Sequence, residues 1–147
     1  MAVDQNYRKV KKYLLLIIFF LLFTSKSFSS NYKFTKIIEL NEPWGSSFIN
    51  NNEIIITEKS GKIKIVNTFS KEVTEIKHNL NFLEVGQGGL LDIIHQDDVL
   101  WISYSENRGD QKTSTSIAKA QLNKQELTFI NIFQANPPID SGYHFGS

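Results

Sequence analysis

The chain has 147 residues, of which 41% are hydrophobic, 21% charged and 12% aromatic, and this length and composition suit one ordinary globular domain. Its formal net charge of +1 gives no electrostatic basis for binding nucleic acid. Because the chain contains no cysteine, a disulfide scaffold, a thiolate nucleophile and a cysteine-ligated metal site are all excluded.

Residues 1–29 have the layout of a secretory signal peptide. An unbroken apolar run of 11 residues, Tyr13–Phe23, directly follows a basic cluster made of Arg8, Lys9, Lys11 and Lys12. A helix needs about 20 apolar residues to cross a bilayer about 30 Å thick, so this run favours a secretory segment over a stable membrane helix. Ser27 and Ser29 are small residues of the kind that a signal peptidase recognises.

We therefore expect cleavage near Ser30 and export of the mature chain to the periplasm or the medium. The alternative is an uncleaved segment that anchors the protein to the membrane. Residues 30–147 then form the second part of the chain, which we expect to be one folded region.

From Ser30 onward the sequence predicts an all-β protein, because its apolar residues form short runs between polar turns and no stretch keeps helical spacing for three turns. The first half contains four predicted strands, Ser46–Ile49, Glu53–Glu58, Lys62–Asn67 and Glu72–Lys77. The first two turns are three asparagines, 50–52, and the segment Lys59–Gly61. We interpret Thr57–Gly61 as a hairpin, since glycine and asparagine tolerate the positive φ of tight turns.

The second half repeats this pattern. Its predicted strands are Leu90–His95, Val99–Glu106, Ser114–Leu122 and Leu127–Gln134. Ile55 and Leu100, which occupy similar places in the two sets, lie 45 residues apart. A four-stranded unit that recurs every 40 to 50 residues is typical of a β-propeller blade. A sandwich or barrel would need long crossover connections, which the sequence lacks.

Two blades and an entering strand at His144 make only part of a propeller, since a ring closes with four to eight blades. We therefore expect the chain to be a truncated, amino-terminal part of a longer protein. In this interpretation Trp44, Trp101 and Tyr104 pack inside or between blades and do not form sugar platforms.

Five segments of the chain resemble the glucose/sorbosone dehydrogenase family in their order and spacing. They are Asn41–Gly45, Thr57–Gly61, Gly86–Asp92, Ser103–Glu106 and Gly142–Ser147. The resemblance implies a six-bladed propeller and a soluble, pyrroloquinoline quinone (PQQ)-dependent oxidoreductase. Such an enzyme oxidises the anomeric carbon of an aldose sugar to a lactone and passes the electrons to an acceptor.

The resemblance also implies two site residues. His144 occupies the place of the family's general base, and an imidazole with a pKa near 6.5 can accept a hydroxyl proton at neutral pH. Gln87 lies where the family has a glutamine beside the cofactor and the sugar, and its amide can donate and accept hydrogen bonds at once. Tyr143 is a departure, because the family often has Asp or Asn before the base.

By the same resemblance, the basic residues that hold the PQQ carboxylates and the ligands of an activating calcium ion lie in later blades. We assign no metal ligand within this chain and expect it to be inactive by itself. The alternative function is a non-catalytic exported propeller module that binds a glycan or a protein.

Amino-terminal sequencing of the protein recovered from a secreting host should find a first residue near Ser30, because the basic cluster and the short apolar run direct cleavage there. A recovered protein that mostly retains Met1 would contradict this prediction.

Overall fold

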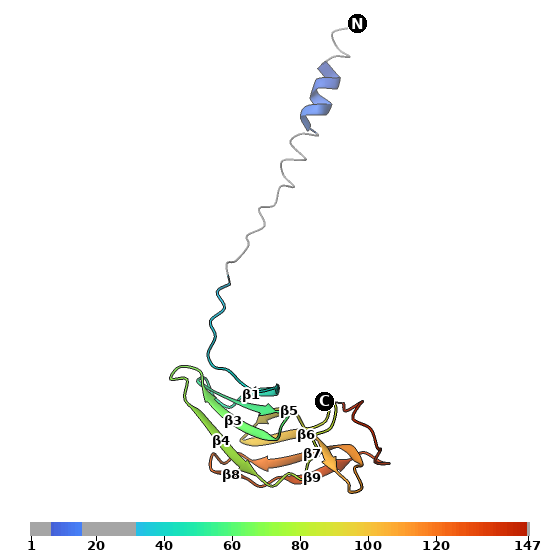
Figure 1. Cartoon of the computed structure of the whole chain (residues 1–147). Helices are drawn as coiled ribbons and strands as arrows, with labels where there is room; N and C mark the ends of the chain where they lie inside the picture. The colour runs from blue at the N-terminus through green and yellow to red at the C-terminus, as the bar shows by residue number, and fades with distance from the viewer. Residues whose placement is uncertain (1–6, 16–31, 147) are drawn as a thin grey trace. The chain divides into compact units, whose positions relative to one another are not determined.

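A computed structural model of the chain describes residues 7–15 and 32–146 (Figure 1). The chain forms two units, Met1–Thr35 and Lys36–Ser147, and each is described by itself. In the first unit a helix over residues 7–15 carries the basic cluster. The rest of the predicted apolar run and the expected cleavage site lie outside the described residues. Among the residues described, no helix has both the length and the apolar character needed to cross a bilayer.

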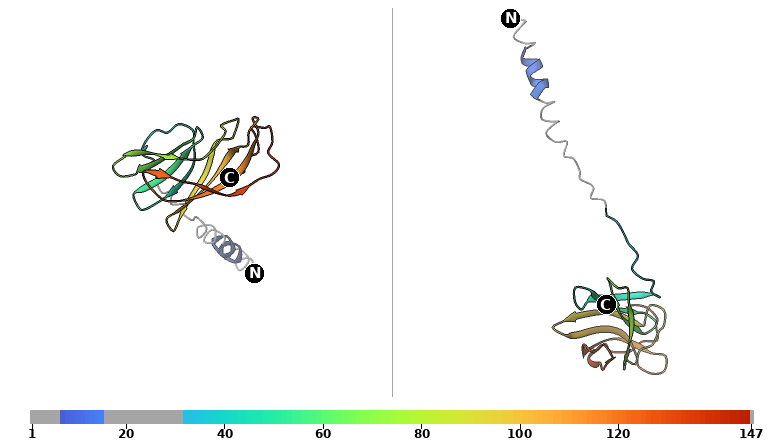
Figure 2. Two further views of the ribbon diagram at one scale, coloured as in Figure 1. Left: turned by 90° about the horizontal axis from the view of Figure 1, so that it is seen from below. Right: turned by 90° about the vertical axis from the view of Figure 1, so that its left-hand side faces the viewer.

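The second unit contains two β-sheets, and the first is built around an antiparallel meander. Its strands are β1 (Pro43–Phe48), β2 (Glu53–Glu58), β3 (Lys62–Asn67) and β4 (Val73–His78), joined by the two-residue strand β8 (Glu126–Leu127). The strand order is β1-β2-β3-β4-β8, with β8 parallel to β4. The view at the left of Figure 2 shows β8, in orange, beside the green strands of this sheet.

The second sheet is a four-stranded antiparallel meander in the order β5-β6-β7-β9. Its strands are β5 (Leu90–Gln96), β6 (Val99–Asn107), β7 (Thr113–Gln121) and β9 (Ile130–Gln134). The long β6–β7 pair runs in continuous register from Val99↔Gln121 to Asn107↔Thr113. The all-β prediction is therefore confirmed for residues 36–146, which fold as two sheets of successive hairpins.

The predicted strands Glu53–Glu58 and Lys62–Asn67 are confirmed at both ends. Their turn is a hairpin, as expected: Gly61 has φ of +98° and its N–H donates to the carbonyl of Glu58 at 2.9 Å. The asparagine turn is also confirmed, because the Asn50 side chain accepts hydrogen bonds from the N–H groups of residues 52 and 53, both at 2.9 Å.

The predicted strand Leu127–Gln134 is wrong, because the chain changes sheets within it. Leu127 belongs to β8 and pairs with His78 in the first sheet, whereas Ile130–Gln134 pairs with β7 in the second. The Asn79 side chain bonds both backbone groups of the intervening Phe129, accepting from its N–H at 2.7 Å and donating to its carbonyl at 3.1 Å. An amide side chain thus takes the place of a neighbouring strand, and no sequence period reveals this.

The predicted strand at His144 is also wrong. Residues 135–146 run as turns and extended backbone, with one isolated bridge between Thr113 and Ile139. His144 has φ of +69°, a left-handed conformation that a strand cannot contain. The backbone at the base candidate therefore turns instead of pairing with a neighbour.

The main hydrophobic core lies between the two sheets and is made by side chains from both. The first sheet contributes Ile55, Ile63, Ile65 and Ile76, and the second contributes Leu90, Ile93, Leu100, Ile102, Tyr104, Ala118 and Ala120. Each strand alternates inward and outward side chains, so the isoleucine-rich pattern of the sequence buries one face of each sheet against the other. Full burial of each large aliphatic side chain stabilises the fold by about 1.5–3 kcal/mol.

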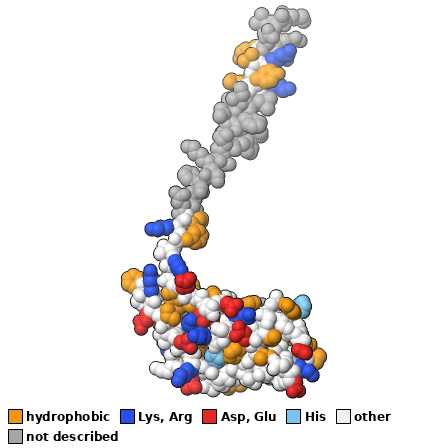
Figure 3. Space-filling view, viewed as in Figure 1, with side chains coloured by type: hydrophobic (Ala, Val, Ile, Leu, Met, Phe, Trp, Pro, Cys, Tyr) orange, Lys and Arg blue, Asp and Glu red, His pale blue; other side chains and the backbone are white. Residues whose placement is uncertain are grey.

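The outward face of each sheet is partly apolar and exposed to solvent. On the second sheet Trp101 is 38% exposed, Ile94 54% and Phe133 53%. On the first sheet, neighbouring strands pair Phe48 with Ile54, Ile54 with Val66 and Val66 with Val73. Phe48 and Val73, at the two ends of this row across the sheet, are exposed. Figure 3 shows such apolar patches between Lys, Asp and Glu side chains on one face of the molecule. Tyr104 is buried, as expected, but neither tryptophan is buried in this chain.

The two sheets approach each other most closely at their first strands. A Cβ at Gly45 of β1 would lie 2.6 Å from the Asp92 Cα of β5, so no larger residue fits there. The Thr57 hydroxyl, which is fully buried, accepts from the Gly45 N–H at 2.9 Å and donates to the Leu91 carbonyl at 2.5 Å. One side chain of β2 thus connects β1 with β5.

Glu58 at the end of β2 is a buried carboxylate held by two donors. Its Oε1 accepts from Lys64 Nζ at 2.7 Å and from the Asn41 N–H at 2.8 Å, and the residue is 1% exposed. Burial by itself raises the pKa of Glu58, but the hydrogen bonds from Lys64 and Asn41, together with the charges of Lys64 and Lys62, outweigh burial and lower the pKa below its ordinary 4.5. The charged form is therefore the one that the fold stabilises.

We predict that Glu58 makes stability depend on pH in the acid range. A carboxylate whose pKa is lower in the folded than in the unfolded chain stabilises the fold above about pH 4.5, and this contribution is lost as the pH falls through the folded pKa. Glu58→Gln should therefore reduce the slope of unfolding free energy against pH between pH 3 and 5, measured by urea unfolding.

The matched control is Glu75→Gln, which removes a carboxylate from an exposed pair with Lys62 and should change the free energy of unfolding by only a few tenths of a kcal/mol. Equal slopes for the wild type and Glu58→Gln would contradict the assignment.

Candidate functional site

The Gln87 loop joins β4 to β5 and contains three glycines that allow close packing of backbone on backbone. Gly86 has φ of +55°, and a Cβ there would lie 2.3 Å from the Gly142 carbonyl oxygen. A Cβ on Gly89, where φ is +152°, would lie 2.1 Å from the Lys59 carbonyl oxygen. These positions require glycine, so the Gly-Gln-Gly-Gly pattern reflects a crowded loop and not a flexible one.

The tail segment, residues 139–146, lies directly against this loop. The Gln87 N–H donates to the Gly142 carbonyl at 2.7 Å. A Cβ on Gly142 would lie 3.0 Å from the Gly86 Cα, so the two backbones pack closely. Upstream, the tail is held by Thr113 at the start of β7, whose N–H and carbonyl bond the carbonyl and N–H of Ile139, both at 2.9 Å. The tail therefore reaches Gln87 with its path set by β7.

His144 and Gln87 are thereby brought together, although 57 residues separate them in the sequence. The His144 N–H donates to Gln87 Oε1 at 3.4 Å, a long hydrogen bond that directs the side-chain carbonyl of Gln87 toward the backbone of His144. Both residues are exposed. Within the described part of the chain, neither the imidazole of His144 nor the side-chain NH₂ of Gln87 has a hydrogen-bond partner.

This arrangement has a definite chemical capability. An exposed imidazole at neutral pH can accept a proton from a hydroxyl group that approaches it. The neighbouring NH₂ group of Gln87 can donate to an oxygen of the same ligand. The pair therefore fits a ligand with a hydroxyl group to be deprotonated and an acceptor oxygen close to it.

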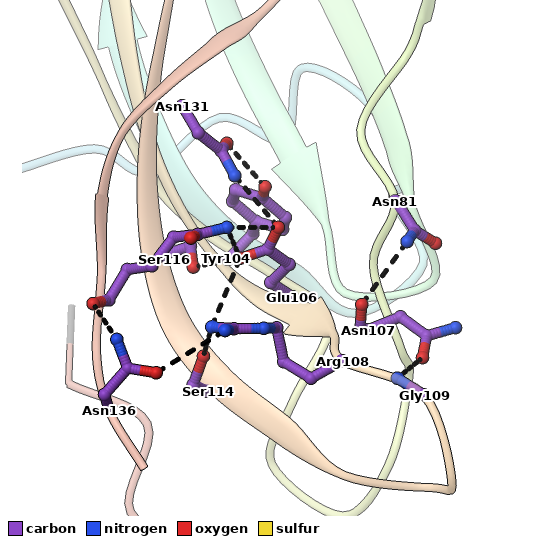
Figure 4. Close-up of polar contacts among 11 residues, drawn as sticks. Asn81, Tyr104, Glu106, Asn107, Arg108, Gly109, Ser114, Ser116, Asn131 and Asn136 are labelled. Carbon is purple, nitrogen blue, oxygen red and sulfur yellow. Dashed lines mark hydrogen bonds and ion pairs between the residues drawn. The ribbon is translucent and has the colours of Figure 1, made fainter. Parts of the chain in front are cut away.

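A second polar cluster, built around Glu106, was not expected from the sequence (Figure 4). The Glu106 carboxylate accepts hydrogen bonds from Ser116 at 2.6 Å, Asn131 at 2.9 Å and Gln134 at 2.7 and 2.8 Å. An Arg108 nitrogen lies 3.9 Å from it. Four hydrogen bonds saturate the carboxylate, so we interpret this Glu106 cluster as structural.

The Glu106 cluster ties together three strands and Asn136, which precedes the tail segment. Tyr104 on β6 donates to Asn131 on β9 at 2.7 Å, and burial raises the pKa of this phenol, which therefore stays a neutral donor. Arg108 donates to Ser114 on β7 at 3.0 Å and to Asn136 at 3.4 Å (Figure 4). Period-2 alternation places residues 104 and 106 on one face of β6, but their partners come from β7 and β9 and are not predictable from spacing.

The described residues offer little positive charge to an anionic ligand at Gln87 and His144. Lys59, beside the loop, forms an ion pair with Glu42 at 3.8 Å, and Arg108 is engaged in the Glu106 cluster. In this part of the chain no group of three or more His, Cys, Asp or Glu side chains has the arrangement of a metal site. The Gln87–His144 pair therefore offers a proton acceptor and a hydrogen-bond donor to a ligand, but the described residues beside it offer little to neutralise an anionic group.

Comparisons with known proteins agree on one family. Its model, described as glucose/sorbosone dehydrogenase, matches residues 40–147. Over 117 residues the chain is 27% identical to the aldose sugar dehydrogenase YliI of Escherichia coli (strain K12). The matched region covers 74% of this chain and 32% of that protein.

Solved structures show the same relationship. The apo form of the soluble aldose sugar dehydrogenase from Escherichia coli is 29% identical, with a TM-score of 0.67 over 73% of this chain and 33% of that one. The PQQ-bound aldose sugar dehydrogenase from Streptomyces coelicolor, at 18% identity and a TM-score of 0.59, shares the fold over 67% of this chain and 32% of that one. The chain thus spans about a third of the length of these relatives.

Gly86→Ala tests the contact between the Gln87 loop and the tail. Alanine at φ of +55° is strained by about 1–2 kcal/mol, and its Cβ would also displace the Gly142 carbonyl. Gly109→Ala is the matched control, since Gly109 has φ of +80° and no atom within 4 Å of its Cβ position. We expect Gly86→Ala to lose roughly 1–3 kcal/mol more unfolding free energy than the control in urea unfolding. Equal losses would show that the contact carries no stability.

Proposed function

This chain belongs to the glucose/sorbosone dehydrogenase family, and we propose that it forms part of an exported, PQQ-dependent enzyme that oxidises the anomeric carbon of an aldose sugar to a lactone. The observation that carries the proposal is the juxtaposition of Gln87 and His144 across 57 residues of sequence. The two sheets would be the first two blades of a six-bladed propeller. The proposed export rests on the amino-terminal basic and apolar segments.

His144 is the proposed general base. Its ring is exposed and has no hydrogen-bond partner in the described part of the chain, so a sugar hydroxyl can reach it. The chain turns at this residue, where the backbone is left-handed with φ of +69°. The hydrogen bond between the Gln87 N–H and the Gly142 carbonyl holds the tail two residues earlier and so supports this strained conformation. The imidazole takes the proton of the anomeric hydroxyl as the C–H bond at the same carbon breaks.

Gln87 is the proposed orienting residue. Its Oε1 is directed to the His144 N–H, which leaves the two N–H donors of the amide for a sugar or quinone oxygen. The Gln87 backbone is fixed by the bond to Gly142, so the amide is held in place before a ligand arrives.

The balance of the reaction requires a hydride acceptor as well as a base. The sugar loses a proton to His144 and a hydride from its anomeric carbon, and the product is the lactone. PQQ, when bound, supplies the quinone that accepts this hydride before its electrons pass to an external acceptor. Positive groups for the PQQ carboxylates, and ligands for an activating calcium ion, are proposed to lie in the part of the relatives that this chain does not span.

We predict that the gene product containing this chain reduces an artificial electron acceptor when given PQQ, Ca²⁺ and an aldose. His144→Ala should lower kcat by about 10²–10⁴-fold, the range for loss of a general base, while PQQ binding is largely retained. Gln87→Ala should cost less, because it removes hydrogen bonds but no proton acceptor. Steady-state kinetics and PQQ titration measure the two effects.

Two controls separate chemistry from folding. His144→Asn keeps a residue that tolerates positive φ but cannot act as the base, so it should be as inactive as His144→Ala. His95→Asn changes a histidine near the end of β5 that lies away from the Gln87 loop, and this variant should retain full activity. Full activity in His144→Ala would remove the assigned base, and binding of a glycan without any PQQ-dependent oxidation would favour the non-catalytic module.

A further inference from the structure

Ser105 on β6 bonds both ends of the loop that carries Gln87. Its N–H donates to the Gly89 carbonyl and its carbonyl accepts from the Leu83 N–H, both at 2.9 Å. Its hydroxyl adds a third contact, since Oγ lies 2.6 Å from the Leu83 carbonyl oxygen and 3.3 Å from that of Gly89. The residue is fully buried.

The Ser105 side chain also sets the space in which the loop and the tail meet. A Cβ on Gly88 would lie 2.8 Å from Ser105 Oγ on one side and 2.9 Å from a ring carbon of Phe145 on the other. Gly88 is therefore packed between β6 and the residue that follows His144. Any shift of Ser105 or Gly88 would move Gln87 relative to His144.

We propose that Ser105 is a positioning residue that holds Gln87 at the hydrogen-bonding distance from the His144 segment. The backbone bonds of residue 105 persist with any side chain, so the hydroxyl is the part that a substitution removes. Without it, the partly buried Leu83 carbonyl loses the one hydrogen bond described for it, and the loop opens more often at this end. The consequence for sugar oxidation rests on the proposed function, whereas the positioning itself does not.

The chain contains a matched control on the same strand. Ser103 has the same orientation as Ser105, two residues away, and its Oγ accepts from the Asp92 N–H of β5 at 3.1 Å. Ser103→Ala thus removes a hydroxyl from the same face of β6 without touching the Gln87 loop.

The test measures the hydrogen-exchange rates of individual backbone amides of the chain by NMR. The Gln87 N–H is protected by the Gly142 carbonyl, and the Thr113 N–H, protected by Ile139, reports on the tail upstream. Ser105→Ala should raise the exchange rate of the Gln87 amide roughly tenfold, with little change at Thr113. Ser103→Ala should leave the Gln87 amide unchanged. A role in general stability would instead raise both rates together.

Unchanged exchange of the Gln87 amide in Ser105→Ala, or an equal increase in Ser103→Ala, would overturn the proposal. If Ser105→Ala does not fold, Gly88→Ala displaces the same contact from the loop side and should raise the Gln87 exchange rate in the same way. No increase in that variant would also overturn the proposal.

A PQQ titration in the presence of Ca²⁺, run on the gene product that contains this chain, separates this inference from the proposed function. A selective increase in Gln87 exchange together with no PQQ binding by the wild type would support the positioning role and reject the proposed function. PQQ binding by the wild type without the change in Gln87 exchange would support the proposed function and reject the positioning role. If both hold, Ser105→Ala should lower kcat/KM for the sugar about tenfold, whereas Ser103→Ala should leave it unchanged.

Discussion

The apolar layer between the two sheets determines where the other parts of residues 36–146 lie. Its isoleucines from β2, β3 and β4 face leucine, isoleucine and tyrosine side chains from β5 and β6. Because sheets pack at close to interior density, this layer fixes the position and the tilt of β6. β6 in turn supplies the backbone and the hydroxyl that hold the Gln87 loop, and pairs with β7, which holds the tail.

The change in chemistry along β6 explains how one strand can serve the core and the site. Leu100, Ile102 and Tyr104 face the first sheet within the core. Further along the strand the side chains become polar: Ser105 bonds the Gln87 loop, and Glu106 gathers donors from β7 and β9. Buried polar groups of this kind are tolerated because they are hydrogen-bonded, and their directional bonds specify one arrangement of loop and tail where an apolar contact would allow several.

Close backbone packing explains the glycines of the Gln87 loop. Gly86, Gly88 and Gly89 stand where a Cβ would collide with the tail, with Ser105 or with the β2–β3 turn. Their absence of side chains lets the Gln87 amide bond the Gly142 carbonyl directly. The site pair is exposed, yet its backbone is held by buried contacts, and this combination suits a residue that must meet a ligand in a fixed position.

The sequence by itself determined the fold class, the family and most strands, because period-2 alternation and glycine or asparagine turns are local properties of the chain. The resemblance of their segments made Gln87 and His144 candidates, and what the sequence could not show is that close packing of Gly86 and Gly142 brings the two together. Tertiary structure alone decided the transfer of Leu127 to the first sheet, through Asn79, and the Glu106 cluster. Each depends on a side chain that reaches a backbone or a strand 25 to 50 residues away, and a one-dimensional pattern records neither the partner nor the distance.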